Sequence, residues 1–133
     1  MPRLRGHHLI CLHFFHGTGY DEDFVVNLMR VTESLRHEKI EIVHGPDDVC
    51  RKCRHLERER CGYSEDADGE MERMDSLALR LLTASRGERI EWDVIRKRLP
   101  GLFSGWYESC CTGCDWRRAC EQDALYRELR MGP

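Results

Sequence analysis

The chain has 133 residues and a formal net charge of -3, with 41% hydrophobic and 34% charged residues. This length is usual for one domain and short for two, so the sequence predicts a single domain over residues 1–133. The near balance of acidic and basic residues excludes a strongly basic nucleic-acid-binding surface and argues against disorder. We therefore expect no nucleic-acid partner.

The amino terminus lacks the features of an export signal. The apolar run over residues 9–15 is short and contains His13, and no small-residue cleavage site follows it. No stretch of the sequence approaches the length of a membrane span. We expect a cytoplasmic protein with no membrane partner, in which clustered thiols are more often metal ligands or redox groups than structural disulfides.

Hydrophobic periodicity predicts a helix and a strand in the amino-terminal half. Residues 9–15 fit a buried strand or a short helix, because periodicity does not distinguish the two in so short a run. Apolar positions at three- and four-residue steps then predict a helix over residues 22–36, with Asp21 as its N-cap. The β-branched run Ile40–Val43 predicts a strand that a Gly-Pro pair ends.

The carboxyl-terminal half is predicted to be helical. The expected helices cover residues 69–85, 92–99, a segment from 102 onward, and 120–130. Gly87 is placed to stop the first of them, and Pro100 to end the second. The last helix is expected to direct Ala124, Leu125 and Leu129 inward. The sequence thus predicts an α+β fold that is predominantly helical, with four or five short helices, one small sheet and two cysteine-rich metal-binding loops.

Eight cysteines, six of them in two similar triplets, carry the main functional signal. Each triplet has a C-x2-C pair and a third cysteine a few residues later: Cys50, Cys53 and Cys61 in one, and Cys111, Cys114 and Cys120 in the other. The tight turn of a C-x2-C pair directs both sulfurs inward, and a bound cation keeps them as thiolates. The surrounding segments are polar and arginine-rich, where cysteines that only fill a core are not expected. The sequence therefore predicts metal ligation by these six thiols.

Each triplet leaves one position open, because zinc sites and cubane clusters ordinarily take four protein ligands. Cys11 is the leading candidate for a fourth ligand, because a helix would place His7 and His8 on the same face as this thiol. A cysteine packed in the core is the alternative for Cys11. The two histidines are predicted to serve the cofactor as ligands, as hydrogen-bond donors to a cluster sulfur, or in proton transfer. Cys110 is the other spare thiol, but neighbouring residues seldom both reach one metal.

No familiar catalytic motif accompanies the cysteines. The sequence has no nucleotide-binding glycine loop, serine nucleophile elbow or H-E-x-x-H helix. Asp47 and Asp48, just before the first triplet, are expected to cap the turn that opens that loop. The histidines without a comparable context are expected to be solvated or packed: His13, His16, His37 and His44.

Three segments carry a resemblance to a known family: residues 4–12, with their paired histidines and Cys11, residues 17–20, and residues 45–50 with the C-x2-C pair that follows. Through them nearly the whole chain resembles the small prokaryotic family called domain of unknown function 1284. The resemblance implies an iron–sulfur cofactor and no defined reaction. It gives the ligand role to the six triplet cysteines and makes the histidine pair and Cys11 part of the site.

Three functions fit these observations. The first is an iron–sulfur protein used for electron transfer, sensing or Lewis-acid chemistry. The second is a zinc-stabilised interaction module, whose function would lie on its arginine-rich surface. The third is a thiol–disulfide oxidoreductase that uses a C-x2-C pair, although two matched triplets exceed what that chemistry needs. The sequence does not decide whether the protein is an enzyme, which redox or protein partner it has, or its oligomeric state.

Overall fold

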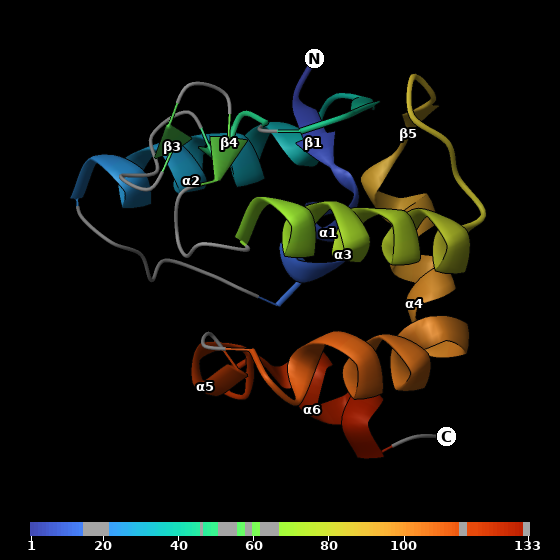
Figure 1. The fold of residues 1–133 in the computed structure, drawn as a ribbon. Helices are drawn as coiled ribbons and strands as arrows, with labels where there is room; N and C mark the ends of the chain where they lie inside the picture. The colour runs from blue at the N-terminus through green and yellow to red at the C-terminus, as the bar shows by residue number, and fades with distance from the viewer. Residues whose placement is uncertain are drawn as a thin grey trace.

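The structure is a computed structural model of the chain (Figure 1). It describes residues 1–14, 22–45, 47–50, 56–57, 60–61, 67–114 and 117–131, and of residues 56–57, 60–61 and 67–68 it describes the backbone only. Helices make up most of the described part, and the strands are short. The predicted α+β, predominantly helical fold is therefore confirmed.

One small sheet lies along one side of the helices (Figure 1). Its strands, in spatial order, are β1 (Arg3–Arg5), β2 (Ile40–Val43) and β5 (Arg89–Ile90). β1 runs parallel to β2 with Leu4 opposite Ile42, and β5 runs antiparallel to β2 with Ile90 opposite Ile40. These four side chains are buried. β2 has the predicted bounds, whereas strands as short as β1 and β5 contain too few residues to show an alternating pattern.

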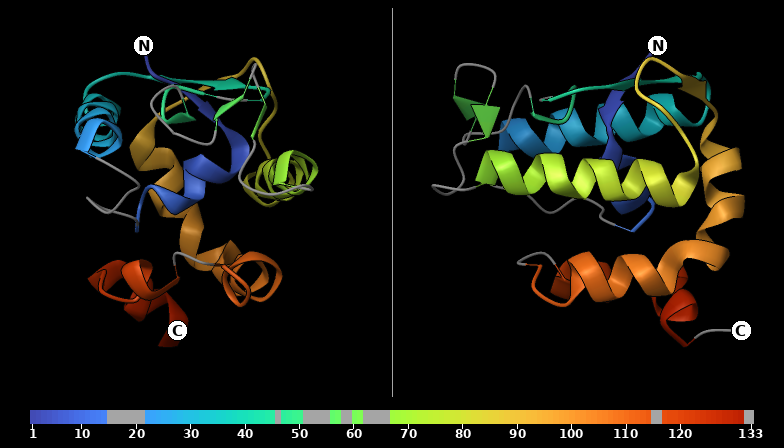
Figure 2. Two further views of the ribbon diagram at one scale, coloured as in Figure 1. Left: turned by 60° about the vertical axis from the view of Figure 1, so that its left-hand side comes forward. Right: turned by 45° about the vertical axis from the view of Figure 1, so that its right-hand side comes forward.

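Three helices lie beneath the sheet, with α1 between the other two (Figure 2, left). They are α1 (Gly6–Cys11), α2 (Glu22–Leu35) and α3 (Ala67–Leu82). α1 settles the ambiguity in favour of a helix for residues 9–11, and this helix begins earlier than the apolar run. Residues 12–14 form a turn, and residue 15 lies outside the described residues. α2 and α3 confirm the two predicted helices to within three residues at each end. The predicted N-cap Asp21 lies outside the described residues.

α4 (Trp92–Trp106) continues through Pro100, so the prediction of two helices separated at this proline is wrong. Proline removes one backbone hydrogen bond and bends a helix without necessarily ending it, and the axis of α4 turns sharply near its middle (Figure 2, right). Leu99 and Leu102 are buried on either side of the bend and anchor both halves in the core. α4 then passes into a π-helix, η2 (Tyr107–Cys111).

The carboxyl-terminal helix is split, contrary to the single helix predicted over residues 120–130. Its parts are α5 (Arg117–Cys120) and α6 (Ala124–Met131). The carboxylate of Asp123 accepts the backbone N–H of Tyr126 at 2.9 Å, which is the N-cap interaction that starts a new helix. Tyr126 is fully buried. Of the residues predicted to point inward, Leu125 and Leu129 are half-buried and pack against the core, whereas Ala124 is exposed.

An aromatic cluster attaches the carboxyl-terminal segments to the end of α1. Phe14, Phe103 and Tyr126 meet edge to face, with ring centroids 5.4 to 5.5 Å apart. Such contacts add to the stabilisation from burial by about 0.5–1.5 kcal/mol each. Because Phe14 follows α1 while the other two rings come from α4 and α6, the cluster brings the second cysteine triplet to the underside of α1.

The first triplet is described only in part. Beyond Cys50, the structure places the backbone of a two-stranded pairing of β3 (Leu56–Glu57) with β4 (Arg60–Cys61). Cys53 lies outside the described residues, and of Cys61 the backbone alone is described.

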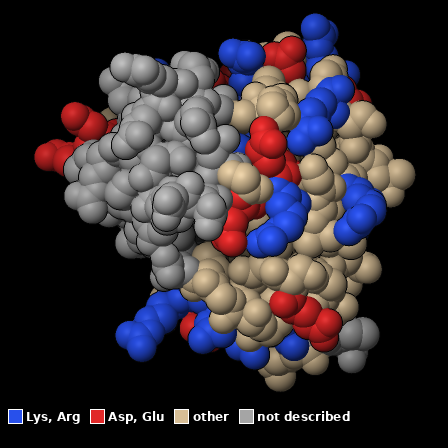
Figure 3. All heavy atoms as spheres, viewed as in Figure 1, with Lys and Arg blue, Asp and Glu red and all other residues tan. Residues whose placement is uncertain are grey.

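The surface agrees with the balanced charge of the sequence. In the view of Figure 3, lysines and arginines are interspersed with aspartates and glutamates and form no continuous basic face. No helix in the described ranges is long and apolar enough to cross a bilayer.

Candidate metal centre

The amino-terminal motif sits in the interior because α1 packs closely on α3. Asp75 of α3 contacts this motif through both carboxylate oxygens. Oδ1 accepts the backbone N–H of His7 at 2.9 Å and its ring Nδ1–H at 2.6 Å, and Oδ2 accepts Nε–H of Arg5 at 2.8 Å. All three side chains are buried. Burial opposes ionisation of Asp75, but His7 and Arg5 outweigh it and hold its pKa below the ordinary value.

His7 is neutral in this setting. Burial, together with the neighbouring His8, lowers the pKa of His7 to about 4, although Asp75 acts in the opposite direction. Because Nδ1 donates to a carboxylate, the neutral ring keeps its proton there and leaves Nε2 with a free lone pair. That is the arrangement in which a carboxylate orients a histidine toward a metal or a proton acceptor.

Asp47 holds His8 in the same way and also shapes the turn before Cys50. Its Oδ2 accepts His8 Nδ1–H at 2.6 Å and the backbone N–H of Arg5 at 2.8 Å. Its Oδ1 accepts the backbone N–H groups of Val49, at 3.0 Å, and Cys50, at 3.2 Å, so it caps the turn as predicted. Burial raises the pKa of Asp47, but His8 and these N–H donors lower it by more.

Asp48 does not share this role. Its carboxylate accepts the backbone N–H of Arg3 at 2.9 Å, and its carbonyl accepts the side-chain amide of Asn27 at 2.8 Å. Asp48 therefore joins the loop to β1 and α2, whereas Asp47 contacts the candidate centre.

His8, Asp47 and Cys50 form a group with metal-binding donors. Within the described ranges it is the one set of three such side chains that offers ligand atoms all within 4.8 Å of one another. Imidazole nitrogen, carboxylate oxygen and thiolate sulfur are donors that bind zinc and iron. Burial and the charge of Asp47 raise the pKa of Cys50 to about 12, with Arg5 opposing them. We call this group the His8–Cys50 site.

A second group brings together four thiols from α1 and the carboxyl-terminal segments, and we call it the four-thiol site. Its members are Cys11, Cys111, Cys114 and Cys120. Burial, then the charges of Cys111, Cys120, Cys114 and lastly the adjacent Cys110, raise the pKa of Cys11 well above its ordinary value. Burial and neighbouring thiols likewise raise the pKa of Cys120 to about 12. Such mutual effects occur between near neighbours, and without a cation to stabilise their thiolates Cys11 and Cys120 stay protonated at neutral pH.

η2 determines which of two adjacent thiols faces inward. Cys111 is buried, whereas Cys110 is half-buried. Burial raises the pKa of Cys111 to about 11, and the nearby Tyr126 hydroxyl acts in the opposite direction. That hydroxyl is itself buried, and it completes no hydrogen bond within the part of the chain that the structure describes. π-turns of this kind are frequent at functional sites.

The structure brings most of the predicted site residues into these two groups. Cys11 lies near the second triplet and also packs against the hydrophobic core, and Cys50 lies beside His8. The six cysteines whose side chains are described are all free thiols: Cys11, Cys50, Cys110, Cys111, Cys114 and Cys120. The side chains of Cys53 and Cys61 lie outside what the structure describes, so their ligand role stays a prediction.

Sequence reasoning missed Asp75 and the buried Arg5. One signal for Asp75 was present, because this acidic residue occurs on the apolar stripe of α3 between Met74 and Ala78. An acidic residue on a buried stripe needs a partner.

The predictions for two other histidines are confirmed: His13 stacks on Trp92 at 3.5 Å between ring centroids, and the exposed His37 lies 3.2 Å from Glu33. His44 is also exposed, and His16 lies outside the described residues.

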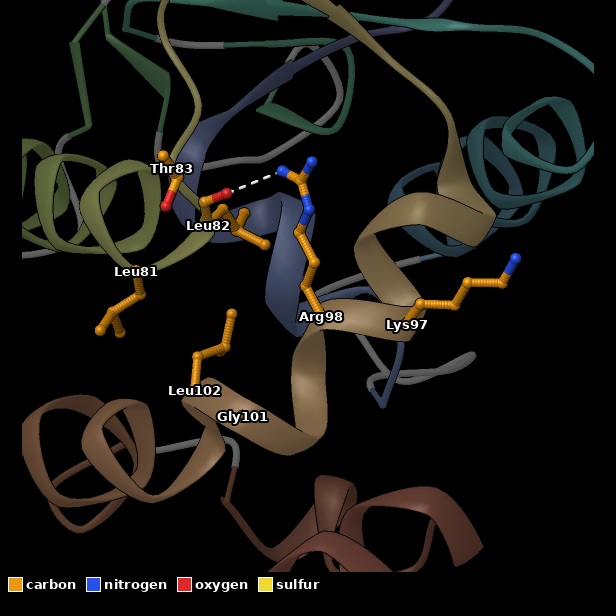
Figure 4. A pocket seen from close by; sticks show the side chains of 7 residues that line it. All are labelled: Leu81, Leu82, Thr83, Lys97, Arg98, Gly101 and Leu102. Carbon is orange, nitrogen blue, oxygen red and sulfur yellow. Dashed lines mark hydrogen bonds between the residues drawn. The ribbon is translucent and has the colours of Figure 1, made fainter.

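An open hollow lies elsewhere, between the end of α3 and the middle of α4 (Figure 4). Lys97 and Leu102 line it, and Arg98 reaches across it to donate a hydrogen bond to the Leu82 carbonyl at 2.8 Å. The hollow contains none of the thiols or paired histidines, so it does not belong to the candidate centre.

The fold and the two groups define a cysteine-rich α+β protein with a candidate metal centre around α1. The family model described as "Protein of unknown function (DUF1284)" matches residues 19–120, and the chain belongs to this family. No curated protein and no solved structure gave a significant match.

Proposed function

We propose that the protein binds an iron–sulfur cluster at the four-thiol site. The observation that carries this proposal is the convergence of Cys11 with the second triplet, which supplies the fourth thiolate that the triplet lacks. Four thiolates are the usual ligand set of such clusters. The site is lined by buried groups, and the Tyr126 hydroxyl without an acceptor lies next to Cys111, where a ligated thiolate would accept its hydrogen bond.

The spacing of the thiols favours a polynuclear centre over a single zinc ion. Zinc–sulfur bonds of about 2.3 Å in a tetrahedron place the sulfurs roughly 3.8 Å apart. In the described part of the chain, no three of these thiols lie within 4.8 Å of one another, since the His8–Cys50 site alone meets that limit. A centre of several irons holds its thiolates further apart than one ion does, and it fits this wider arrangement better.

The residues around the site would hold and protect the cluster. The four thiolates would ligate it, and the aromatic cluster of Phe14, Phe103 and Tyr126 would limit access of water. When bound, an iron–sulfur cluster accepts and donates single electrons, and its potential depends on burial and on hydrogen bonds to sulfur. We infer a role in electron transfer or sensing in a reducing cytoplasm, with a redox partner.

Purification of the full chain without oxygen tests this proposal. We expect brown protein with iron and acid-labile sulfide in equal amounts, broad visible absorption, and an electron paramagnetic resonance signal that changes on reduction. Colourless protein with stoichiometric zinc at the four thiols would instead favour the zinc-stabilised module. Protein that takes up neither iron with sulfide nor zinc would contradict metal binding.

A further inference from the structure

We propose that His8 and Cys50 ligate a single transition-metal ion, zinc or ferrous iron, at a second centre, and that Asp47 positions both ligands. This centre is separate from the four-thiol site and does not depend on the iron–sulfur proposal. The two donors come from α1 and from the turn after β2. Together with Asp47, each offers one ligand atom, which for His8 is one of the two ring nitrogens, and these atoms all lie within 4.8 Å of one another. Nitrogen and sulfur donors together are typical of zinc and of iron.

Asp47 is a positioning residue because its carboxylate has no free acceptor position. Each of its oxygens already accepts two hydrogen bonds, from three backbone N–H groups and from His8 Nδ1. The bond to Nδ1 fixes the proton on that nitrogen and leaves Nε2 as the coordinating atom. The bond to the backbone N–H of Cys50 fixes the turn that presents the thiol, so one carboxylate organises both ligands.

Arg5 supplies an independent indication of an anionic ligand at this place. Its side chain is 1% exposed, and Nε is paired with Asp75, but its second terminal nitrogen has no hydrogen-bond partner among the described residues. A buried donor without an acceptor is costly and rare in native proteins. Cys50 is the thiol that interacts with this guanidinium. Ligation to a metal makes Cys50 a thiolate, and a thiolate there would be an acceptor for this nitrogen.

α1 would then contribute one ligand to each of two neighbouring centres. His8 and Cys11 are three residues apart and lie on the same side of the helix, about 4.5 Å apart along its axis. His8 faces the turn after β2, whereas Cys11 faces the carboxyl-terminal thiols. His8 would thus serve the centre at Cys50, and Cys11 would serve the four-thiol site.

Cobalt binding tests the second centre without interference from the first. The double variant Cys114→Ser, Cys120→Ser disables the four-thiol site, and its metal-free form is titrated with Co²⁺ without oxygen. We expect one tightly bound cobalt with thiolate-to-cobalt absorption in the near ultraviolet. In this background, His8→Ala or Cys50→Ser should abolish tight binding. Asp47→Asn should weaken binding by about tenfold to a hundredfold.

Two matched variants serve as controls. His44→Ala removes an exposed histidine, and Asp48→Asn changes the carboxylate that contacts β1, so neither should alter cobalt affinity. Unchanged cobalt affinity in His8→Ala, or no binding by a double variant with intact circular dichroism, would overturn the proposal. If the double variant does not fold, the chain with His8→Ala alone should bind one cobalt fewer than the unmodified chain, and an equal stoichiometry would overturn it as well. Iron and sulfide content reports separately on the four-thiol site.

Discussion

A Cβ atom on Gly6 would lie 2.4 Å from the backbone carbonyl oxygen of Asp75. No side chain fits in that space, so α1 rests directly on the backbone of α3. This close approach lets the Asp75 carboxylate reach both Arg5 and His7. Gly6 therefore helps to orient the paired histidines, because it allows α1 to approach α3 closely.

Gly6→Ala should destabilise the fold. The clash is with backbone atoms, which cannot move aside as a flexible side chain can, and we expect the free energy of unfolding to fall by at least about 1–3 kcal/mol. Urea denaturation of the metal-free protein measures this. Gly69→Ala is the matched control, because a Cβ there meets nothing within 4 Å. Equal stability of the two variants would show that α1 does not pack on α3 as described.

The stability of the metal-free protein should depend on pH through His7. In the unfolded chain this histidine has its ordinary pKa of 6.5, whereas in the folded chain its pKa is about 4. Between these values the unfolded state binds more protons, so the free energy of unfolding should decrease as the pH falls from 6.5 to 4. Asp75 should lower the free energy of unfolding further at still lower pH, because its pKa in the folded chain lies below its ordinary value of 3.8.

Unfolding curves at several pH values separate this effect from that of other groups. His7→Gln should reduce the slope between pH 6.5 and 4. His37→Gln should leave it unchanged, because that ring is exposed and its contact with Glu33 lies on the surface. An identical slope in His7→Gln and the unmodified chain would argue against a buried neutral His7.

Much of the fold followed from the sequence because periodicity reports on burial. The stripes of α2 and α3 and the β-branched run of β2 are long or distinctive enough to identify their elements. The error at Pro100 arose because local propensity was overridden by burial of Leu99 and Leu102 on both sides of the bend. Strands of two or three residues carry no such pattern.

The sequence predicted most of the side chains that could bind a metal, but it did not predict all of the residues that orient them. Cysteine spacing identified the triplets, and the motif around Cys11 indicated a fourth thiol. Which histidine faces which group depends on contacts across 39 residues, between His8 and Asp47, and across 68 residues, between His7 and Asp75. A single sequence does not encode such pairs in any local pattern.

The Tyr126 hydroxyl should affect the cofactor and not the fold. Tyr126→Phe removes a buried hydroxyl without an acceptor, so the metal-free protein should be as stable as before or slightly more stable. In the loaded protein the loss of a donor near Cys111 should lower the reduction potential, because hydrogen bonds to sulfur favour the reduced cluster. A redox titration measures this, with Tyr107→Phe as the control. An unchanged reduction potential in Tyr126→Phe would show that the hydroxyl does not donate a hydrogen bond to a cluster ligand.

The most direct test of the account compares Cys11→Ser with Cys110→Ser. Both variants remove one thiol near the second triplet, but Cys11 is proposed to complete the four-thiol site, whereas Cys110 is not. After purification without oxygen, iron and acid-labile sulfide per chain should fall strongly in Cys11→Ser and stay at the level of the unmodified protein in Cys110→Ser. Full iron and sulfide content with an unaltered visible spectrum in Cys11→Ser would contradict the claim that Cys11 is the fourth ligand, and would show that this cysteine only packs in the core.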